Sequence, residues 1–160
     1  DFIDFCQISP ELSRDFRGLR IWLPFKLHGI EPFRQALEEK LDLAEWATAQ
    51  LRTMTDIEII AEPQLSIVAF RLKRPGFDTP ALNQLNQRLL NAINSRKRVL
   101  LTGTLLGDQT GDVVGDQFVI RICALCFRTH YDRVEMCLED IRAACREVEA
   151  ACPRSFPPHA

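Results

Sequence analysis

Two short β-type runs, residues 57–61 and 65–72, are separated by only three residues. A link this short joins antiparallel neighbours, because a parallel connection needs a crossover of roughly a dozen residues. A second pair of β-type runs, residues 99–105 and 117–125, follows later in the chain. The sequence therefore predicts two antiparallel strand pairs.

Apolar residues recur at spacings of three and four in residues 79–94 and 131–151, which predicts a helix after each strand pair. A helix with one apolar face covers one side of a sheet. The predicted fold class is therefore α+β: a four-stranded antiparallel sheet with helices on one face, in the order β-β-α-β-β-α. In the last helix the residues expected to face inward are Val134, Cys137, Leu138, Ile141, Ala144, Cys145 and Val148.

Two further helices are predicted before the first strand. Ser9 and Pro10 are typical of a helix start. Gly29 closes this helix after His28, and a kink is expected at Pro24. A second helix is predicted over residues 31–53. Its apolar stripe comprises Phe33, Leu37, Leu41, Ala44, Ala47 and Leu51, and the charged residues expected on its solvated face are Glu38, Glu39, Lys40, Asp42 and Glu45.

Composition narrows the classes of function. The 160-residue chain carries 20 basic and 22 acidic side chains, a formal net charge of -2, so no excess of positive charge indicates a nucleic-acid partner. No apolar run approaches the roughly 18 residues of a membrane span, so no membrane partner is expected. The length is that of one domain with an appendage.

Six cysteines are present, and Cys123 and Cys126 form a C-x-x-C pair. A chain this long can bury a core without disulfides, and the scattered histidines supply no second ligand pair for zinc. We therefore expect small, reduced, buried cysteines and no metal site, with redox or metal use of the pair as the alternative. Residues 107–117 repeat Gly-Asp-Gln and are interpreted as a long hairpin loop, because their spacing matches neither an EF-hand nor a P-loop.

Arg121 is the candidate site residue. Its neighbours in the predicted strand over residues 117–125 are apolar from Phe118 to Leu125. A guanidinium there stays charged, and burying it without a carboxylate or phosphate partner costs free energy. Residue chemistry leaves two readings open: a pair with an acid of this chain or an extension into water, and a contact with a bound carboxylate.

The leading segment, residues 10–22 (PELSRDFRGLRIW), resembles the P-x-L-S-R-x-F-R-x-L-x-x-W stretch of the group II amino-acid decarboxylases, which depend on pyridoxal 5'-phosphate (PLP). These include the aromatic-L-amino-acid and glutamate decarboxylases. Residues 118–123 (FVIRIC) and 127–130 (FRTH) resemble the F-V-L-R…R-T block near that family's C-terminus. The resemblance spans nearly the whole chain, and the second block is more similar to the aromatic-type enzymes.

The resemblance implies the small C-terminal domain of a fold-type I PLP enzyme. Residues 1–29 would be a connecting segment and helix from a missing large domain, residues 30–152 the small domain, and residues 153–160 a tail. The family's Schiff-base lysine lies in a histidine–lysine motif that surrounds none of Lys26, Lys40, Lys73 and Lys97. The chain is therefore expected to contain no catalytic residue, to bind no PLP by itself and to be inactive alone.

The resemblance also implies that Arg121 meets the α-carboxylate of an L-amino-acid substrate, in a cytoplasmic, homodimeric carboxy-lyase. The alternative is a free-standing α+β binding or dimerisation module without catalysis. In either case the leading segment carries more large apolar groups than a small domain buries, so an exposed apolar surface is expected. These groups are Phe2, Ile3, Phe5, Ile8, Trp22, Leu23 and Phe25.

Overall fold

The computed structural model of the chain describes residues 15–107 and 116–151. The chain divides into two compact units, with the division between Ala36 and Leu37. The first unit contains α1 (Arg17–His28), and α2 (Glu31–Arg52) begins in the first unit and runs into the second. Gly29 ends α1 with a φ of 74°, a left-handed conformation that favours glycine, and its amide donates to the Phe25 carbonyl.

α1 differs from its prediction at its start. The predicted cap at Ser9 and Pro10 lies outside the described residues, but Asp15 and Phe16 are not helical and the helix begins at Arg17. α1 continues through Pro24 as a single helix. None of its residues is buried, and Phe25 meets Phe33 edge to face, with ring centroids 4.6 Å apart.

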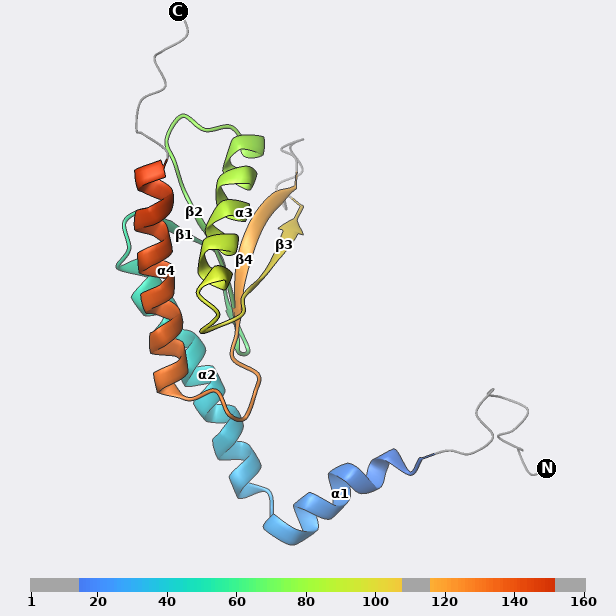
Figure 1. The fold of residues 1–160 in the computed structure, drawn as a ribbon. Helices are drawn as coiled ribbons and strands as arrows, with labels where there is room; N and C mark the ends of the chain where they lie inside the picture. The colour runs from blue at the N-terminus through green and yellow to red at the C-terminus, as the bar shows by residue number, and fades with distance from the viewer. Residues whose placement is uncertain (1–14, 108–115, 152–160) are drawn as a thin grey trace, which may run out of the picture. The chain divides into compact units, whose positions relative to one another are not determined.

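The second unit is built on a four-stranded antiparallel sheet in the order β1-β2-β4-β3. The strands are β1 (Ile57–Gln64), β2 (Ile67–Leu72), β3 (Thr102–Leu106) and β4 (Gln117–Cys123). β4 is a central strand, because Ala69 of β2 and Thr102 of β3 both pair with its Arg121. The predicted strand pairs and their antiparallel sense are confirmed (Figure 1).

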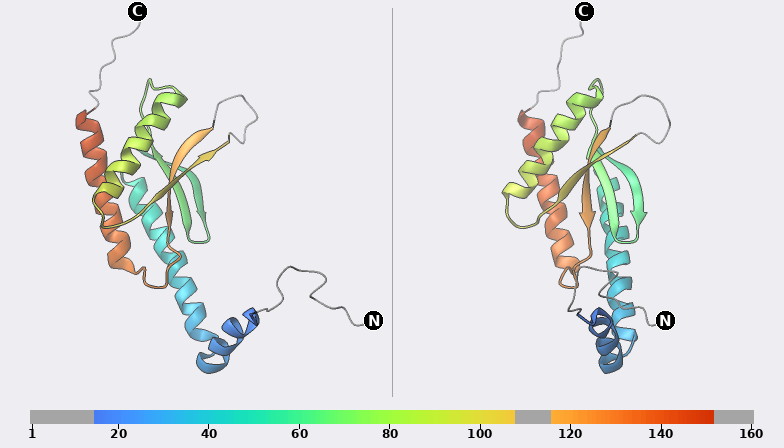
Figure 2. Two further views of the ribbon diagram at one scale, coloured as in Figure 1. Left: turned by 45° about the vertical axis from the view of Figure 1, so that its right-hand side comes forward. Right: turned by 90° about the vertical axis from the view of Figure 1, so that its right-hand side faces the viewer.

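The helices α2, α3 (Thr79–Ser95) and α4 (Tyr131–Ala151) pack on one face of this sheet, as Figure 2 shows. Alternate strand residues enter one core with them, because successive side chains of a strand point to opposite faces. The strand residues of this core include Val68, Phe70, Leu72, Ile120 and Ile122, and the helix residues include Leu51, Leu89, Ile93, Leu138 and Ile141. The predicted fold class is therefore confirmed.

α3 is tied to the sheet by asparagine side chains. Asn86 is fully buried; its amide oxygen accepts from the Leu72 amide at 2.6 Å and its nitrogen donates to the Leu72 carbonyl at 3.0 Å. Asn94 makes the same two bonds to Leu101, at 2.9 and 3.0 Å. These side chains act as strand partners where no neighbouring strand is available.

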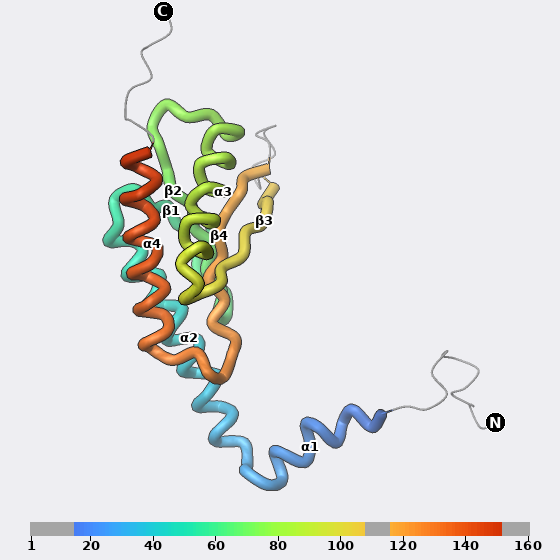
Figure 3. The backbone as a smooth tube through the Cα atoms, in the orientation of Figure 1, coloured from blue at the N-terminus to red at the C-terminus, as the bar shows by residue number. Residues whose placement is uncertain are grey.

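Strand ends differ from the predicted limits for local reasons. β2 begins at Ile67 because Leu65 has a φ of 56° and turns the hairpin. β4 ends at Cys123 because Ile67, its last partner, is the first residue of β2. β3 begins at Thr102 because the Asn94 side chain occupies the peptide groups of Leu101. The backbone trace in Figure 3 shows β3 beside β4.

The apolar stripe of α2 is only half buried, which corrects the prediction. Ala44, Ala47 and Leu51 are buried, but Leu37 is 68% exposed and Leu41 is 39% exposed. The core therefore reaches α2 only in its second half. The predicted inward face of α4 is buried, with Cys145 partly exposed.

Candidate functional site

Arg121 projects from the sheet face opposite the helices, because its strand neighbours Ile120 and Ile122 point into the core. One guanidinium nitrogen donates to the hydroxyl of Thr102, its cross-strand partner, at 3.2 Å. Within residues 15–107 and 116–151, no carboxylate forms an ion pair with Arg121. Its Nε is buried and has no hydrogen-bond partner. The guanidinium therefore carries a charge that the described part of the chain does not neutralise.

Arg71 offers a direct comparison on the same sheet face. It lies on β2, two residues after Ala69, which pairs with Arg121. Its Nε donates to Glu58 at 3.0 Å, and Glu58 is its cross-strand neighbour on β1. One arginine of this face is thus neutralised by an acid of the chain, whereas among the described residues Arg121 is held by a neutral hydroxyl alone.

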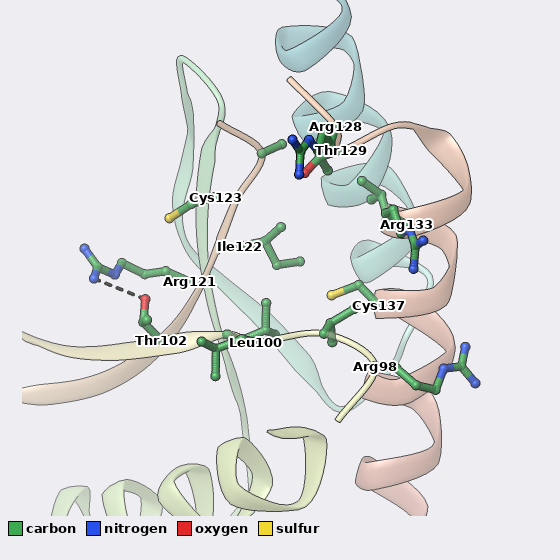
Figure 4. Close-up of a pocket in the computed structure, with 14 residues that line it drawn as sticks. Arg98, Leu100, Thr102, Arg121, Ile122, Cys123, Arg128, Thr129, Arg133 and Cys137 are labelled. Atoms are coloured by element: carbon green, nitrogen blue, oxygen red, sulfur yellow. Dashed lines mark hydrogen bonds between the residues drawn. The ribbon is translucent and has the colours of Figure 1, made fainter. Parts of the chain in front are cut away.

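A cavity of about 470 Å³ lies where the end of β4, the segment before β3 and the start of α4 meet. Its floor is made of buried core residues, which include Ile122, Val134 and Cys137. Figure 4 shows Ile122 and Cys137 turned toward one another inside it, whereas Arg121 extends away from its centre toward Thr102. Arg121 nevertheless belongs to the lining of the cavity, so β4 contributes residues from both of its faces, Arg121 and Ile122, to this site.

The cysteine prediction needs correction. The four described cysteines are free thiols, but Cys123 and Cys126 are exposed, and only Cys137 is fully buried. Cys123 is exposed because it alternates with Ile122 and faces away from the core, and Cys126 lies in the turn after β4. Burial, with a smaller contribution from Asp140, raises the pKa of Cys137 to about 12. The thiol at the cavity floor is therefore protonated at neutral pH and is not a nucleophile.

Lys40 corrects a second prediction, that of a solvated charged face on α2. It is only 5% exposed, and its ammonium donates to the Thr129 carbonyl at 2.5 Å and to Glu39 at 2.7 Å. Glu39 also lies 2.7 Å from Nδ1 of His130. Hydrogen bonds from Lys40 and His130 hold the pKa of Glu39 below its usual value. This network fastens α2 to the segment that carries Arg128 and Thr129.

No local sequence pattern predicts this network of hydrogen bonds, because its partners lie about ninety residues apart in the sequence. The first residue after it, Tyr131, stacks on Trp46 with ring centroids 4.2 Å apart. Together these contacts fix the start of α4 and the rim of the cavity to α2.

The cavity lining includes no lysine to form a Schiff base and no carboxylate to pair with a pyridine nitrogen. Lys40 is buried and bonds to Glu39 and Thr129, and Lys26, Lys73 and Lys97 are exposed and are not lining residues of the cavity. Among the described side chains, no group of three or more histidines, cysteines or acids is arranged to hold a metal ion. None of the helices in the described ranges has the length and apolar character needed to cross a bilayer.

Comparison with known proteins identifies relatives of this chain. Residues 2–73 match the conserved domain of pyridoxal-dependent decarboxylases. The chain is 34% identical over 94% of its length to an aromatic-L-amino-acid decarboxylase of Bacillus atrophaeus, and 35% identical over 79% of its length to one of Bos taurus. It spans 30% and 23% of the lengths of these two relatives.

The fold matches that of a larger solved structure. Tryptophan decarboxylase of Catharanthus roseus, crystallised with L-tryptophan, superposes with a TM-score of 0.74 and 24% identity. The match covers 91% of this chain and 29% of that enzyme. Sequence and fold point to the same group of proteins. The chain therefore belongs to the group II PLP-dependent decarboxylases and corresponds to a C-terminal portion of them.

Proposed function

We propose that this chain is the C-terminal domain of an amino-acid decarboxylase, a lyase that releases carbon dioxide from an L-amino acid, and that Arg121 binds the substrate carboxylate. The observation that carries the proposal is the contrast between Arg121 and Arg71. Arg71 has Glu58 as its partner, whereas Arg121 has only the Thr102 hydroxyl. A guanidinium with no acid of its own is suited to a carboxylate supplied from outside the chain.

Arg121 would act by orientation. Its planar fork fixes a carboxylate through two parallel hydrogen bonds, which sets the direction of the bond between the α-carbon and the carboxylate. The Thr102 hydroxyl, 3.2 Å from the guanidinium, restrains the fork without neutralising it. Because the carboxylate loses its charge as carbon dioxide leaves, a tight grip on the ground state alone would not raise the rate. A single, partly buried arginine binds the carboxylate with moderate strength.

The chain would be inactive alone, because the described residues offer PLP neither a Schiff-base lysine nor a pyridine partner in the cavity. The relatives are about three to four times longer, since the chain spans 30% and 23% of their lengths. We place the cofactor, the catalytic residues and the large domain in that remaining part. Within this chain, residues 1–29 would connect to the large domain, residues 30–152 would form the small domain and residues 153–160 a tail.

Similarity favours an aromatic L-amino acid as substrate, because both relatives described above are named aromatic-L-amino-acid decarboxylases. The exposed apolar residues of α1 favour burial against the large domain or a second subunit, and so a homodimer. The free state of the four described cysteines favours a reducing compartment such as the cytoplasm.

A free-standing binding or dimerisation module without catalysis is the second candidate. The exposed apolar face of α1 favours it as well, because such surfaces mark interaction sites in proteins of any class. The two candidates differ in whether Arg121 meets a substrate, and in whether a large domain accompanies this chain.

Carbon dioxide release distinguishes the candidates. The 160-residue chain and the longer protein that carries it are each incubated with PLP and carboxyl-labelled L-tryptophan, L-tyrosine or L-dopa. Borohydride reduction then traps any lysine that has formed a Schiff base. We expect release of labelled carbon dioxide and one reduced lysine in the longer protein only, at a position outside this chain.

Two results would overturn the proposal. Turnover by the 160-residue chain, or stoichiometric labelling of one of its four lysines, would show that it holds the catalytic machinery itself. A longer protein that released carbon dioxide from no L-amino acid would favour the non-catalytic module.

A further inference from the structure

The cavity beside β4 combines an apolar floor with a cationic rim. Its floor includes the buried residues Ile122, Ala124 and Val134, and its lining contains four arginines and no aspartate or glutamate. Its volume of about 470 Å³ falls within the range of small-molecule sites, which are mostly apolar with a few placed polar groups. The charge of its rim therefore decides what kind of molecule it suits.

Two of the rim arginines have acid partners. Arg98 donates to Glu139 at 2.7 Å and lies 3.6 Å from Asp140, and Arg133 lies 3.6 Å from Asp132. Arg128 has no carboxylate within ion-pair distance in the part of the chain that the structure describes, and its guanidinium carbon lies 5.1 Å from the centre of the Phe127 ring. Arg128 is thus the cavity's cation without a counter-charge on the helix side of β4.

The segment that carries Arg128 is held in place by a buried lysine. Lys40 is buried to 95%, and burying an ammonium requires compensating bonds, which Thr129 and Glu39 provide. His130, the next residue, is bound to Glu39. Figure 4 shows Arg128 and Thr129 together at one end of the cavity. A buried lysine thus fixes the backbone of the residue that follows the unpaired arginine.

Arg121 is the fourth arginine of the lining, but its guanidinium extends away from the centre of the cavity toward Thr102. Ile122 faces the cavity and Arg121 points to the opposite side of β4, because successive residues of a strand alternate. A ligand bound among Ile122, Val134 and Cys137 would therefore not receive its hydrogen bonds from the guanidinium that Thr102 holds.

We propose that this cavity binds a monocarboxylate carried by an apolar chain or ring, with Arg128 as the anchor of the carboxylate. The planar fork of arginine matches a carboxylate, and the desolvated floor accepts the apolar body. The Cys137 thiol at the floor is buried and needs no polar group of the ligand as a partner. The site is an addition to the substrate contact at Arg121 and does not depend on it.

Binding is tested on the 160-residue chain by amide chemical shifts during titration with sodium octanoate at low ionic strength. We expect saturable shifts at the amides of Ile122, Thr129 and Val134. Arg128→Gln should raise the dissociation constant at least about tenfold, equivalent to about 1.4 kcal/mol. Octan-1-ol, which lacks the charge, and acetate, which lacks the apolar chain, should each bind at least about tenfold more weakly than octanoate.

The matched control is Arg88→Gln, which removes the same charge from an exposed position on α3 that does not line the cavity. It should leave octanoate binding unchanged. Thermal unfolding of each variant, followed by circular dichroism, identifies any variant whose fold is damaged. Arg128→Lys then serves as a second variant. It keeps the positive charge and loses the planar guanidinium, and it should bind octanoate more weakly than the parent chain.

Several results would overturn the inference: equal affinity for octanoate and octan-1-ol, equal affinity for octanoate and acetate, or no saturable shift below about 10 mM octanoate. Loss of binding in Arg121→Gln but not in Arg128→Gln would place the carboxylate at Arg121. That outcome would refute the cavity site and still support the proposed function.

Discussion

Arg71 and Arg121 occupy the same face of the sheet and differ in what surrounds their charges. Arg71 pairs with Glu58, and its side chain is only 14% exposed. Arg121 is restrained by Thr102 and keeps a buried Nε without a partner. The two residues therefore form a matched pair for mutation, one structural and one proposed to bind substrate.

In the longer enzyme, Arg121→Lys should lower catalytic efficiency by more than about tenfold, because lysine keeps the charge and loses the two-pronged contact. The free energy of unfolding should change by about 1 kcal/mol or less, since no acid among residues 15–107 and 116–151 pairs with Arg121. Steady-state kinetics and denaturant unfolding on the same protein measure both. Arg71→Lys, the control, should leave efficiency per folded molecule within about threefold of the parent. A large loss of stability with unchanged efficiency in Arg121→Lys would identify a scaffold arginine.

Glu39 links the stability of the second unit to pH. Hydrogen bonds from Lys40 and His130 lower its pKa from 4.5 in the folded state. A carboxyl with a lowered folded pKa contributes stability that is fully present above its unfolded pKa and is lost as pH falls through the folded pKa. We therefore expect the thermal midpoint of the chain to fall below a pH of about 4.5, and the fall to be smaller in Glu39→Gln.

Thermal unfolding at a series of pH values measures this difference. Glu38→Gln is not a suitable reference, because Glu38 has interactions of its own. Glu45→Gln, on an exposed position of the same helix, is the control and should follow the parent curve. Identical pH profiles for the parent and Glu39→Gln would show that the Lys40 network contributes no acid-sensitive stability.

At the scale of elements, α3 is the helix that completes the sheet. Asn86 pairs with both peptide groups of Leu72, and Asn83 pairs with the Phe118 amide and the Asp116 carbonyl. Each amide side chain offers one acceptor and one donor group, as a neighbouring strand would. The sheet therefore depends on the position of α3 for hydrogen bonds as well as for apolar packing.

Asn86→Leu should destabilise the chain by about 2–5 kcal/mol, because two buried peptide groups of Leu72 lose their partners and leucine supplies none. Asn91→Leu is the control: Asn91 lies on the exposed side of α3, its side chain bonds only to Gln87, at 3.3 Å, and the change should cost less than about 0.5 kcal/mol. Urea unfolding of both variants measures the difference. Similar midpoints for the two variants would contradict a role for Asn86 in holding β2.

The sequence predicts the helices and strand pairs, whose patterns are local. It does not predict the side-chain contacts that join one element to another. The periods of α3 and α4 and the short link of the first hairpin specify helices and strand pairing directly. The start of β3 could not be predicted, because residues 99–101 have strand-like composition, and Leu101 instead bonds to the side chain of Asn94 on the preceding helix. The burial of Lys40 could not be predicted either, since the segment that covers it comes from Thr129.

In the candidate site, too, one residue could be predicted from the local sequence and the cavity could not. Arg121 is conspicuous in the sequence because a charged residue interrupts an apolar strand. The cavity beside it is assembled from β4, the segment before β3 and α4, and no single stretch of sequence carries its pattern. The same distribution explains why the exposure of Cys123 was missed: its burial depends on which face of β4 the helices cover.

At the scale of the whole molecule, the first unit carries apolar surface that it does not bury itself. Every residue of α1 is at least partly exposed, and Phe16, Ile21, Leu27 and Ile30 are each more than 60% exposed. The second unit has a core of its own and leaves Leu37 exposed near its first residues. Apolar side chains gathered in this way mark a surface that another part of a protein covers.

We therefore expect the 160-residue chain to self-associate, because a second copy offers the same apolar residues to cover α1. The double variant Ile21→Asp/Leu27→Asp should be monomeric, since two exposed charges make burial of this face costly. Light scattering after size-exclusion chromatography, over a range of concentrations, measures the mass directly. Gln84→Asp/Arg88→Asp on the exposed side of α3 is the control and should associate as the parent does. If the parent remains monomeric at all concentrations, α1 is not an association surface by itself.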